Sequence, residues 1–394
     1  MKILIVHNLY GDGAPSGENV VYYEELRLLR SKNHEVHCHE INNSDLVQSN
    51  VPKKLLAGLS WVFNIPALLR FYLLVNKVKP DVIHVHNLFP KYSPSLLYRP
   101  KKYPLIMTLH NYRLICPSAQ LRVGASVCLQ CIEEKYFLPS LWNKCFRGSR
   151  LMTFPLMLSS NVHKFLDTWN KRVDRFIALT EFQKSMMVAG GINERKISVR
   201  PNYFTGTPKL LPFHLRSHEV SFVGRISEEK GVNMLCEVWE KLGKSAPVLN
   251  VIGSGPDYIR LREHHSRCSN IKFHGKLDQD SCFRILSRSK FLIVPSLWFE
   301  GFPMVIREAF AHGVPVLASN IGSLDEIISR GGGVTFEAAN PESLSMKVKD
   351  LMNDDTRLNA LSQEAYDRYV NEFSMDINYK KLIEIYETAI IEAS

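Results

Sequence analysis

Two glutamates, Glu300 and Glu308, stand on either side of a turn that leads into a predicted helix. The segment 299–313 reads Phe-Glu-Gly-Phe-Pro-Met-Val-Ile-Arg-Glu-Ala-Phe-Ala-His-Gly. With Met304 as the first helical residue, a rise of about 1.5 Å per residue places the two carboxylates roughly 10 Å apart. A retaining glycosidase needs its carboxylate pair about 5 Å apart, so the spacing argues against that chemistry. It suits instead the two ends of one extended ligand, and a nucleotide sugar, with two sugar rings joined by a diphosphate, has that shape.

Three other segments of the chain contain glycine and are predicted to form loops. They are Ser16-Gly17-Glu18-Asn19, Phe222-Val223-Gly224-Arg225 followed by Lys230-Gly231, and Ile252-Gly253-Ser254-Gly255-Pro256. Ligands of parallel α/β sheets bind at the carboxyl ends of the strands, where backbone N–H groups and helix N-termini favour anions. We therefore predict that the loops at Ser16-Gly17 and at 253–255 face phosphates. Tight turns alone are the alternative for both loops, and Gly255-Pro256 can also mark a helix start.

The segment from Glu300 to Glu308 continues through Gly-Val-Pro-Val-Leu-Ala-Ser to Asp325-Glu326. It resembles the nucleotide-sugar site of retaining glycosyltransferase family four, the glycosyl transferases group 1, and the three glycine-containing segments occur in the order typical of that family. The resemblance covers nearly the whole chain, and bacterial surface-polysaccharide enzymes are the type of member that it indicates. It implies an α/β protein of GT-B fold, in which two Rossmann-like parallel-sheet domains face a central cleft.

The resemblance also implies roles for individual residues. The residues that would bind the donor are Ser16, Gly17, Gly224, Arg225, Lys230, Gly253, Gly255, Glu300, Gly301, Phe302, Pro303, Met304, Val305 and Glu308. The residues that would act in catalysis are His110, Arg225, Lys230 and Glu300.

The resemblance implies a front-face substitution without a protein nucleophile, in which the departing phosphate serves as base. Glu308 would accept ribose hydroxyls and Glu300 hexose hydroxyls. Arg225 and Lys230 would stabilise the negative charge that develops on the leaving diphosphate. An ordinary surface pair is the alternative for these two cations.

Three of the histidines in the first half of the chain are considered as site residues: His84, His86 and His110. His110 follows a predicted strand in Thr-Leu-His-Asn. It resembles the family's first-domain histidine that contacts the transferred sugar, and burial for packing is the alternative. His84 and His86 lie on one face of the preceding strand, and we interpret them as structural because no third metal ligand is evident nearby. Glu25 is placed on the polar side of a helix predicted over 19–32.

Length and composition indicate a globular protein of two domains. A chain of 394 residues exceeds the size of most single cores, and 45% hydrophobic with 22% charged residues is typical of a folded protein. Apolar segments of strand length alternate with helical patterns, which predicts a parallel sheet in each half. These segments begin at Lys2, Asp81, Leu105, Arg175, Val220, Val248, Ile271, Phe291 and Val314.

The predicted domain boundaries follow from the same pattern. The parts are a first domain (1–200) with a cysteine-rich insertion (about 112–150), a proline-containing linker (201–216), a second domain (217–375) and a C-terminal helix (376–394). The return of that helix to the first domain is implied by the resemblance alone.

Asp278-Gln279-Asp280 is similar to a metal-binding Asp-x-Asp, but it stands at a predicted helix start. Aspartates in such a position accept hydrogen bonds from backbone N–H groups and complement the helix dipole. We therefore interpret the segment as a helix cap and predict that catalysis requires no metal or other cofactor.

Four of the eight cysteines lie in the insertion with the spacing C-x11-C-x2-C-x13-C: they are Cys116, Cys128, Cys131 and Cys145. Four thiolates with a central C-x2-C suit a tetrahedral structural zinc that would order an irregular segment. The flanking spacings are loose, so reduced structural cysteines are the alternative. The insertion would also offer a platform for an acceptor.

Positive charge is concentrated in the first part of the chain. Residues 1–175 hold 23 Lys and Arg against 12 Asp and Glu, an excess of 11, and the whole chain has a net charge of +10. This predicts attraction to an anionic membrane surface or a lipid diphosphate, with a plain basic surface as the alternative. No nucleic-acid recognition motif accompanies the charge, so nucleic acid is not an expected partner.

The apolar segment 55–75 is interrupted by Asn64, Pro66 and Arg70, so it is not a transmembrane span. Two shorter amphipathic pieces would lie on a membrane or pack on the first sheet. We recognise no secretory signal peptide. The expected location is the cytoplasm. Peripheral attachment to the inner face of the cell membrane is compatible with this prediction.

The function predicted from the sequence is transfer of a hexosyl-type sugar from a nucleotide-sugar donor to a hydroxyl of a glycan acceptor. The expected acceptor is a lipid-linked precursor of a surface polysaccharide or lipopolysaccharide. Two alternatives stay open. One is a nucleotide-sugar epimerase of the same fold, and the other is a catalytically silent scaffold that binds glycan or lipid.

Overall fold

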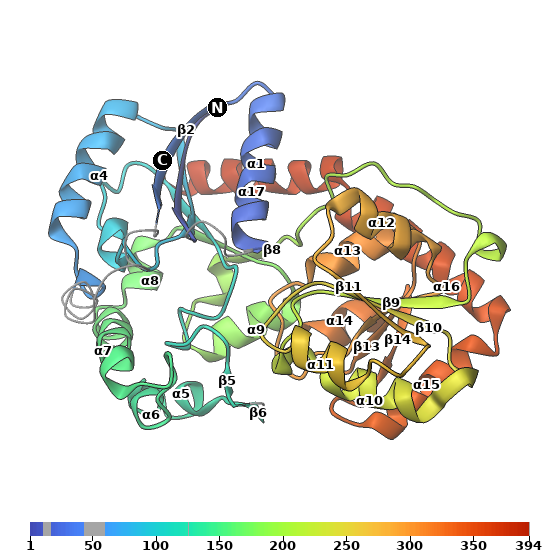
Figure 1. Ribbon diagram of the computed structural model, residues 1–394. Coiled ribbons are helices and arrows are strands. Elements are labelled where there is room, and N and C mark those ends of the chain that lie inside the picture. The colour runs from blue at the N-terminus through green and yellow to red at the C-terminus, as the bar shows by residue number, and fades with distance from the viewer. Residues whose placement is uncertain (11–16, 43–59, 125, 394) are drawn as a thin grey trace. The chain divides into compact units, whose positions relative to one another are not determined.

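The computed structural model describes residues 1–10, 17–42, 60–124 and 126–393 (Figure 1). The chain forms two compact units. Unit 1 comprises Met1–Val123, Cys128–Arg200 and Tyr379–Ser394, and unit 2 comprises Gly124–Val127 and Pro201–Asn378.

Unit 1 is built on a six-stranded sheet in which each described pair of neighbouring strands is parallel. The strands, in spatial order, are β2 (Glu35–Asn42), β1 (Lys2–Leu9), β3 (Val82–Asn87), β4 (Leu105–Thr108), β7 (Arg175–Ala178) and β8 (Ile197–Val199). Strands β3 and β4 are buried along their whole length, as expected of central strands that are covered on both faces.

The helices of unit 1 cover this sheet and form the cysteine-rich region. They are α1 (Gly17–Ser31), α4 (Ile65–Val78), α5 (Gln130–Glu133), α6 (Leu138–Trp142), α7 (Arg150–Phe165), α8 (Thr168–Arg172) and α9 (Glu181–Ala189), with the short 3-10 helices Pro94–Leu97 and Glu194–Lys196. Two short strands, β5 (Arg122–Val123) and β6 (Ser126–Val127), pair with each other.

The C-terminal helix α17 (Met375–Ala393) contributes to the core of unit 1. Its side chains Leu382, Tyr386 and Ala389 pack in one cluster with Ile3 and Ile5 of β1. Burial of such apolar side chains contributes roughly 1.5–3 kcal/mol each. The last residues of the chain therefore help to stabilise its first strand.

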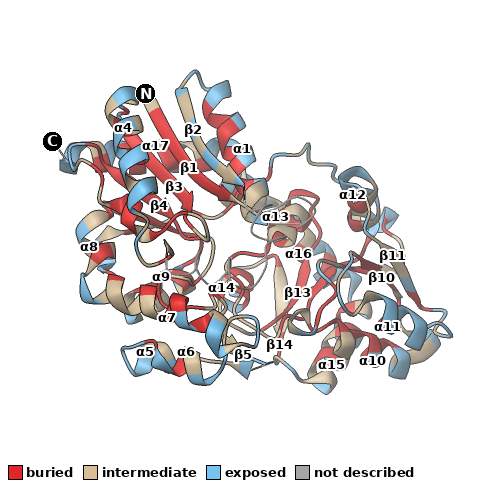
Figure 2. Ribbon diagram, turned by 60° about the vertical axis from the view of Figure 1, so that its left-hand side comes forward, coloured by how far each residue is buried: buried red, intermediate tan, exposed pale blue. Residues whose placement is uncertain are grey.

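Unit 2 contains a second six-stranded sheet, also parallel at each described pair. Its strands, in spatial order, are β11 (Ile271–Gly275), β10 (Val248–Ile252), β9 (Glu219–Val223), β12 (Leu292–Val294), β13 (Val316–Ser319) and β14 (Gly333–Phe336). In Figure 2 the strands of the sheets are largely buried, whereas helices such as α10 and α11 are exposed on their outer sides.

The helices of unit 2 alternate with its strands along the chain. They are α10 (Val232–Leu242), α11 (Tyr258–His264), α12 (Gln279–Arg288), α13 (Met304–Ala311), α14 (Ser323–Ser329), α15 (Pro341–Met352) and α16 (Asp355–Arg368), with 3-10 helices at Phe213–Leu215, Glu228–Lys230 and Gly243–Ser245 and a π-helical turn at Tyr369–Phe373. Trp239 of α10 is fully buried in the core beside Leu235 and Leu249.

Two local predictions are confirmed by these elements. The helix after the Glu300 turn begins at Met304. Asp278 caps α12, because its carboxylate accepts a hydrogen bond of 2.9 Å from the backbone N–H of Ser281. Asp280 lies in the first turn of the same helix, where its negative charge complements the dipole.

Asn64 and Pro66, which were predicted to interrupt the apolar segment, mark the start of α4. Pro66 lies in the first turn of this helix, which Asn64 caps by accepting a hydrogen bond from the N–H of Ala67. A proline is tolerated there because a first-turn N–H has no partner within the helix. The part of the predicted amphipathic segment before residue 60 lies outside the described residues.

Candidate functional site

The predicted donor-binding residues of unit 2 follow three strands that are neighbours in its sheet. Gly224 and Arg225 follow β9, Gly253 and Gly255 follow β10, and the Glu300 turn follows β12. Because these strands are parallel, their carboxyl ends meet at one edge of the sheet. Residues that are far apart in the sequence, such as Gly224 and Glu300, thus belong to one loop region.

The glycines after β10 permit a close approach between two loops. A Cβ atom on Gly253 would lie 1.8 Å from the carbonyl oxygen of Gly224, and one on Gly255 would lie 2.1 Å from that of Ile226. The N–H of Ile226 also donates to the carbonyl of Ser254 at 3.0 Å. The absence of side chains at these positions is therefore required by the packing of the β9 and β10 loops, whatever else the loops bind.

Lys230 is held in place by the glycine that follows it. Gly231 has φ +69°, and a Cβ there would lie 1.9 Å from the carbonyl oxygen of Pro295. This contact fixes the Lys230 turn against the end of β12. The Lys230 ammonium then donates to Glu300 Oε1 at 2.6 Å, and both side chains are largely shielded from solvent.

The Glu300 carboxylate is the centre of a small polar cluster. Its Oε1 accepts hydrogen bonds from Lys230 Nζ, from Ser296 Oγ at 2.7 Å and from Trp298 Nε1 at 3.0 Å. Two of the predicted site residues, Lys230 and Glu300, are thus brought into direct contact. Arg225, the other predicted cation, is exposed.

Ser296 and Trp298 were not predicted from the sequence. They precede Glu300 in Pro-Ser-Leu-Trp-Phe-Glu, directly after the buried strand β12. Their position beyond the carboxyl end of a buried strand is the signal that would have found them.

Helix α13 presents its N-terminus beside this cluster. Pro303 is its N-cap residue and makes no side-chain hydrogen bond to the helix. Phe302 and Pro303 are buried, whereas Gly301, Met304, Val305 and Glu308 are partly exposed. An uncapped N-terminus carries partial positive charge and suits an anion. Glu308 lies one turn further along, within electrostatic range of Cys282.

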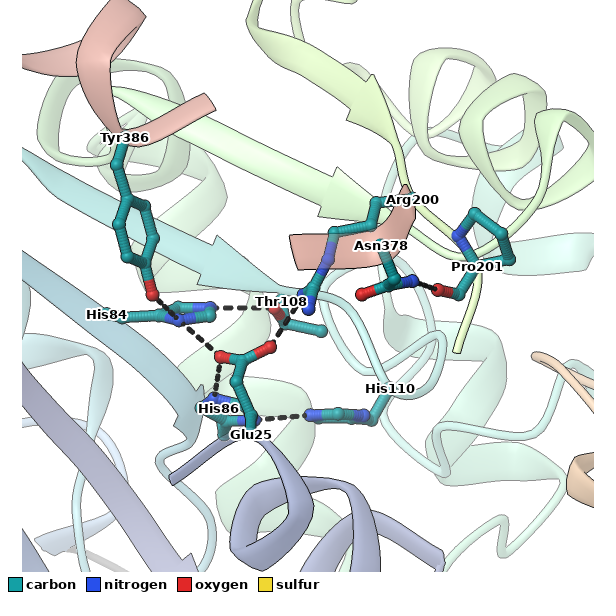
Figure 3. Close-up of polar contacts among 9 residues, drawn as sticks. All are labelled: Glu25, His84, His86, Thr108, His110, Arg200, Pro201, Asn378 and Tyr386. Atoms are coloured by element: carbon teal, nitrogen blue, oxygen red, sulfur yellow. Dashed lines mark hydrogen bonds and ion pairs between the residues drawn. The ribbon is translucent and has the colours of Figure 1, made fainter. Parts of the chain in front are cut away.

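His110 of unit 1 belongs to a buried network of polar side chains (Figure 3). It comes two residues after β4, and its Nε2 lies 3.0 Å from Nδ1 of His86 in β3. His86 Nε2 lies 3.0 Å from Glu25 Oε1, and Glu25 Oε2 accepts from Arg200 at 2.6 Å. His84 also contacts the Glu25 carboxylate, at 2.8 Å.

The predicted placement of Glu25 on the polar side of its helix is wrong. Glu25 is fully buried in unit 1, and it is the third group beside His84 and His86 that the sequence did not reveal. The helix α1 turns this carboxylate inward because Arg200 and the two histidines offer it hydrogen bonds that offset the loss of water.

The ionisation of the network follows from burial and from this ion pair. Burial would raise the pKa of Glu25, but the Arg200 guanidinium and the two histidines hold it well below its usual value. Burial and the neighbouring His84 lower the pKa of His86 to about 4. Burial, assisted by His86, also lowers the pKa of His110 well below 6.5. At neutral pH Glu25 is therefore charged, and His86 and His110 are neutral.

These charges determine the hydrogen-bond directions. A carboxylate only accepts, so His86 donates its Nε2–H to Glu25. A neutral His86 then has a lone pair on Nδ1, which accepts the Nε2–H of His110. His110 consequently carries its own lone pair on Nδ1, and Glu25 sets this tautomer through His86.

The same group of Glu25, His84 and His86 has donor atoms close enough to hold a metal ion. The histidine nitrogens are engaged, however. His84 Nδ1 and Nε2 lie 2.7 Å and 2.8 Å from the hydroxyls of Tyr386 and Thr108. We interpret the three residues as a hydrogen-bonded network, in agreement with the predicted structural role of the histidines.

The loop at the start of α1 is tied to the His110 loop. Glu18 accepts a hydrogen bond of 2.7 Å from Asn111, and burial raises the pKa of Glu18. Asn19 Oδ1 lies 2.9 Å from His7 Nε2. Gly17 is the first residue of α1 and is exposed, and Ser16 lies outside the described residues.

Unit 1 also contains a cavity of about 80 Å³ beside the histidines. Its lining includes Trp61, His86, His110, Asn111, Arg113 and Trp169. The four cysteines of the insertion line a separate, smaller cavity.

Two family models match the chain, and together they span most of it. Glycosyltransferase Family 4 matches residues 15–204, and Glycosyl transferases group 1 matches residues 211–368. The chain therefore belongs to the group 1 glycosyltransferases of family 4.

Several relatives agree with this assignment. Over 395 residues the chain is 23% identical to the uncharacterized glycosyltransferase MJ1178 of Methanocaldococcus jannaschii, covering 97% of this chain and 96% of the relative. It is 26% identical over 254 residues to the O-antigen biosynthesis glycosyltransferase WbnH of Escherichia coli, covering 60% of this chain and 69% of the relative.

A solved structure supports the fold. The crystal structure of Anabaena Alr3699/HepE in complex with UDP-glucose matches with a TM-score of 0.65 at 15% sequence identity, covering 98% of this chain and 100% of that chain. The predicted fold class, α/β with two Rossmann-like parallel-sheet domains as in GT-B glycosyltransferases, is confirmed.

Proposed function

We propose that the protein transfers a hexosyl-type sugar, with retention of configuration, from a nucleotide sugar to a hydroxyl of a glycan acceptor. The observation that carries the proposal is the cluster in unit 2, where the Lys230 ammonium and the Glu300 carboxylate lie in contact beside the uncapped N-terminus of α13. A cation, an acceptor carboxylate and free helix N–H groups at one sheet edge match the diphosphate and the hydroxyls of such a donor.

Each part of this cluster has a defined task in the proposal. The N–H groups at Met304 and Val305 bind the diphosphate, and Glu308 accepts hydrogen bonds from the ribose hydroxyls. Glu300 accepts from hydroxyls of the transferred sugar. Its orientation is fixed by Ser296 and Trp298, so its position does not depend on bound ligand.

Lys230 supports the leaving group. An ammonium has three N–H bonds, and donation of one to Glu300 leaves two for phosphate oxygens. As the bond from the anomeric carbon to the diphosphate breaks, negative charge grows on the phosphate and its attraction to Lys230 and Arg225 increases. The acceptor oxygen bonds to the anomeric carbon on the same face, and its proton passes to the departing phosphate.

Unit 1 supplies the proposed acceptor side. Its cavity of about 80 Å³ combines aromatic walls, Trp61 and Trp169, with polar groups such as His110 and Asn111. Aromatic and hydrogen-bonding side chains together suit a sugar ring. We retain for His110 the role that the family resemblance implies, contact with the transferred sugar.

A lipid-linked acceptor is favoured by the surface of α4. Ile65, Leu69, Tyr72 and Leu73 are 58%, 59%, 44% and 70% exposed and recur along one side of the helix. The first 175 residues carry an excess of 11 positive charges, which attract anionic head groups. We propose that α4 lies on the cytoplasmic membrane surface, where lipid-linked glycans are found. No helix in the described part of the chain is long and apolar enough to span a bilayer.

Catalysis is proposed to need no metal ion, because Asp278 is committed to capping α12. Brief treatment with a chelator is expected to leave the turnover number unchanged. A loss of turnover that magnesium or manganese restores would contradict this part of the proposal.

The proposed reaction is tested by the products of donor cleavage. Purified protein is incubated with UDP-glucose, UDP-galactose, UDP-N-acetylglucosamine, GDP-mannose or ADP-glucose, and the released nucleoside diphosphate is measured. NMR spectra of the first product formed from the effective donor report its anomeric configuration, which is expected to be that of the donor. An inverted first product would refute retention, and an epimerised nucleotide sugar would favour the epimerase alternative.

A further inference from the structure

The cysteine-rich insertion, residues 112–150, is irregular and weakly supported by its own secondary structure. Its helices α5 and α6 have four and five residues, which is too short for a stable isolated helix. Among its described residues, five that are not glycine adopt positive φ angles, a strained conformation for L-residues: they are Ala119, Leu121, Lys135, Lys144 and Arg147. Something beyond local propensity must hold this segment in one shape.

Four cysteines of the insertion meet around a single small cavity. Cys116, Cys128, Cys131 and Cys145 all line it, and its volume is about 10 Å³. That space is on the order of one water molecule, so it has room for one ion. Each thiol comes from a different turn of the chain, and all eight cysteines of the protein are free.

The four thiols are also close enough to influence one another electrostatically. Cys131 is affected by the charges of the other three thiols, and Cys145 by those of Cys116 and Cys128. A bound cation would favour the thiolate form of all four cysteines.

The surroundings of the cavity suit an anionic metal–thiolate centre. Arg122 lines the cavity, and Lys164 interacts electrostatically with Cys131. A hydrogen bond with the backbone of Ser140 favours the Cys131 thiolate. Positive side chains and backbone N–H groups of this kind stabilise the two negative charges that four thiolates leave on a divalent ion.

We propose that Cys116, Cys128, Cys131 and Cys145 bind one structural zinc ion that fixes the fold of the insertion. Binding is written as Zn²⁺ plus four thiols giving a tetrathiolate of charge −2 and four released protons. Four sulfur ligands and a closed coordination shell are typical of structural zinc sites. The ion would tie the loop after β4, the turn after β6, helix α5 and the segment after α6 to one point.

The first test is the metal content of protein purified without chelators. Elemental analysis is expected to find about one zinc ion per chain in the natural protein and a near-complete loss in Cys128→Ser and Cys131→Ser. Cys38→Ser is the matched control, because Cys38 is exposed and lies outside the cavity, and it should retain the ion. Zinc-free protein, or equal zinc in all four proteins, would overturn the proposal.

Failure of a variant to fold is separated from loss of zinc by work on the natural chain alone. Zinc is removed with a mercurial reagent and a chelator, the thiols are restored, and Co²⁺ is added. Sulfur-to-cobalt charge-transfer absorption and strong tetrahedral visible bands are expected. Their absence in protein that still shows a cooperative unfolding transition would overturn the proposal.

Limited trypsin digestion locates the effect of the ion. Lys135, Lys144 and Arg147 are exposed residues of the insertion. Removal of zinc is expected to speed cleavage at these three positions at least tenfold and to leave cleavage at Lys244 of unit 2 unchanged. Identical digestion with and without zinc would mean that the four cysteines are only reduced structural residues. None of these measurements depends on the proposed transferase reaction.

Discussion

At the scale of single residues, the contact between Lys230 and Glu300 gives both side chains a fixed position before any ligand binds. Lys230 is only partly exposed, and its partner carboxylate is nearly buried. A preorganised charge stabilises a transition state without a further cost of reorganisation, which is the condition for a large catalytic effect.

The substitution Lys230→Met is therefore expected to lower the turnover number by about 100-fold or more, because it removes a cation at the leaving phosphate while keeping much of the side-chain volume. Turnover is measured as nucleoside diphosphate release at saturating donor. Lys244→Met, an exposed lysine of unit 2, is the control and should retain full turnover. Near-normal turnover in Lys230→Met would remove this residue from the proposed mechanism.

A second residue-scale prediction concerns the stability of unit 1. Glu25→Gln leaves the Arg200 guanidinium buried beside a neutral amide, and loss of one partner from a buried ion pair costs about 3–5 kcal/mol. Urea denaturation should detect this loss in the free energy of unfolding. Glu35→Gln breaks an exposed pair with Lys2 and should leave that free energy nearly unchanged. Equal effects of the two substitutions would contradict the network.

The wrong prediction for Glu25 shows that the sequence does not reveal hydrogen bonds between residues that are far apart in the chain. Its hydrogen-bond partner Arg200 is 175 positions away, so no local pattern connects them. One signal was available, however. Two histidines in a fully buried strand, His84 and His86, need polar partners, and a carboxylate on a covering helix is a common solution.

At the scale of elements, the sequence predicted central strands better than edge strands. Central strands such as β1 and β12 contain continuous apolar runs, residues 3–6 and 292–294, because they are covered on both faces. The unpredicted strands of the two six-stranded sheets, β2, β8 and β14, each lie at a sheet edge, and the short strands β5 and β6 were not predicted either. β2 reads Glu-Val-His-Cys-His-Glu-Ile-Asn and contains no fully buried residue, so it carries no hydrophobic signal.

The loops predicted to bind the donor lie together at one edge of the unit 2 sheet for a similar reason. Glycine, lysine and glutamate immediately after buried strands are recognisable in the sequence, and parallel strands bring their carboxyl ends together. The hydrogen bonds of Ser296 and Trp298 to Glu300 depend on the path of one loop, which spacing does not determine.

Helix α4 carries an element-scale prediction. The double substitution Leu69→Asp with Leu73→Asp places two charges on its exposed apolar side and should abolish sedimentation with vesicles that contain phosphatidylglycerol. Ile259→Asp is the control, since Ile259 is 61% exposed on α11 of unit 2. If the natural protein stays in the supernatant at low salt, or if the double variant still sediments, α4 is not the membrane-binding element.

At the scale of the whole molecule, the buried histidines make stability depend on pH. Burial lowers the pKa of His7 and of His86 from 6.5 to about 4, each with help from a neighbouring histidine. Below pH 6.5 the unfolded chain binds protons that the folded chain does not, so acidification favours unfolding until pH reaches about 4. Above pH 6.5 both states are neutral at these positions, and this contribution to stability is fully present.

The midpoint temperature of unfolding is therefore expected to fall between pH 6.5 and pH 4, with each histidine contributing up to about 1.4 kcal/mol per pH unit. Differential scanning calorimetry at a series of pH values measures this slope. His86→Asn should reduce it, whereas His214→Asn, which changes an exposed histidine, should not. A midpoint that is constant from pH 7 to pH 5 would show that the histidines are not neutral in the folded protein.

The central claim is that unit 2 binds a nucleotide-sugar donor, and a thermal-shift screen with UDP, GDP, ADP and their common sugar conjugates tests it most directly. A ligand that binds only the folded protein raises its stability by RT ln(1 + [L]/Kd). We predict a higher unfolding midpoint with one nucleotide class, lost in Glu308→Ala and kept in Glu342→Ala, an exposed control on α15. No shift with any nucleotide, or a shift unchanged in Glu308→Ala, would contradict the proposed donor site.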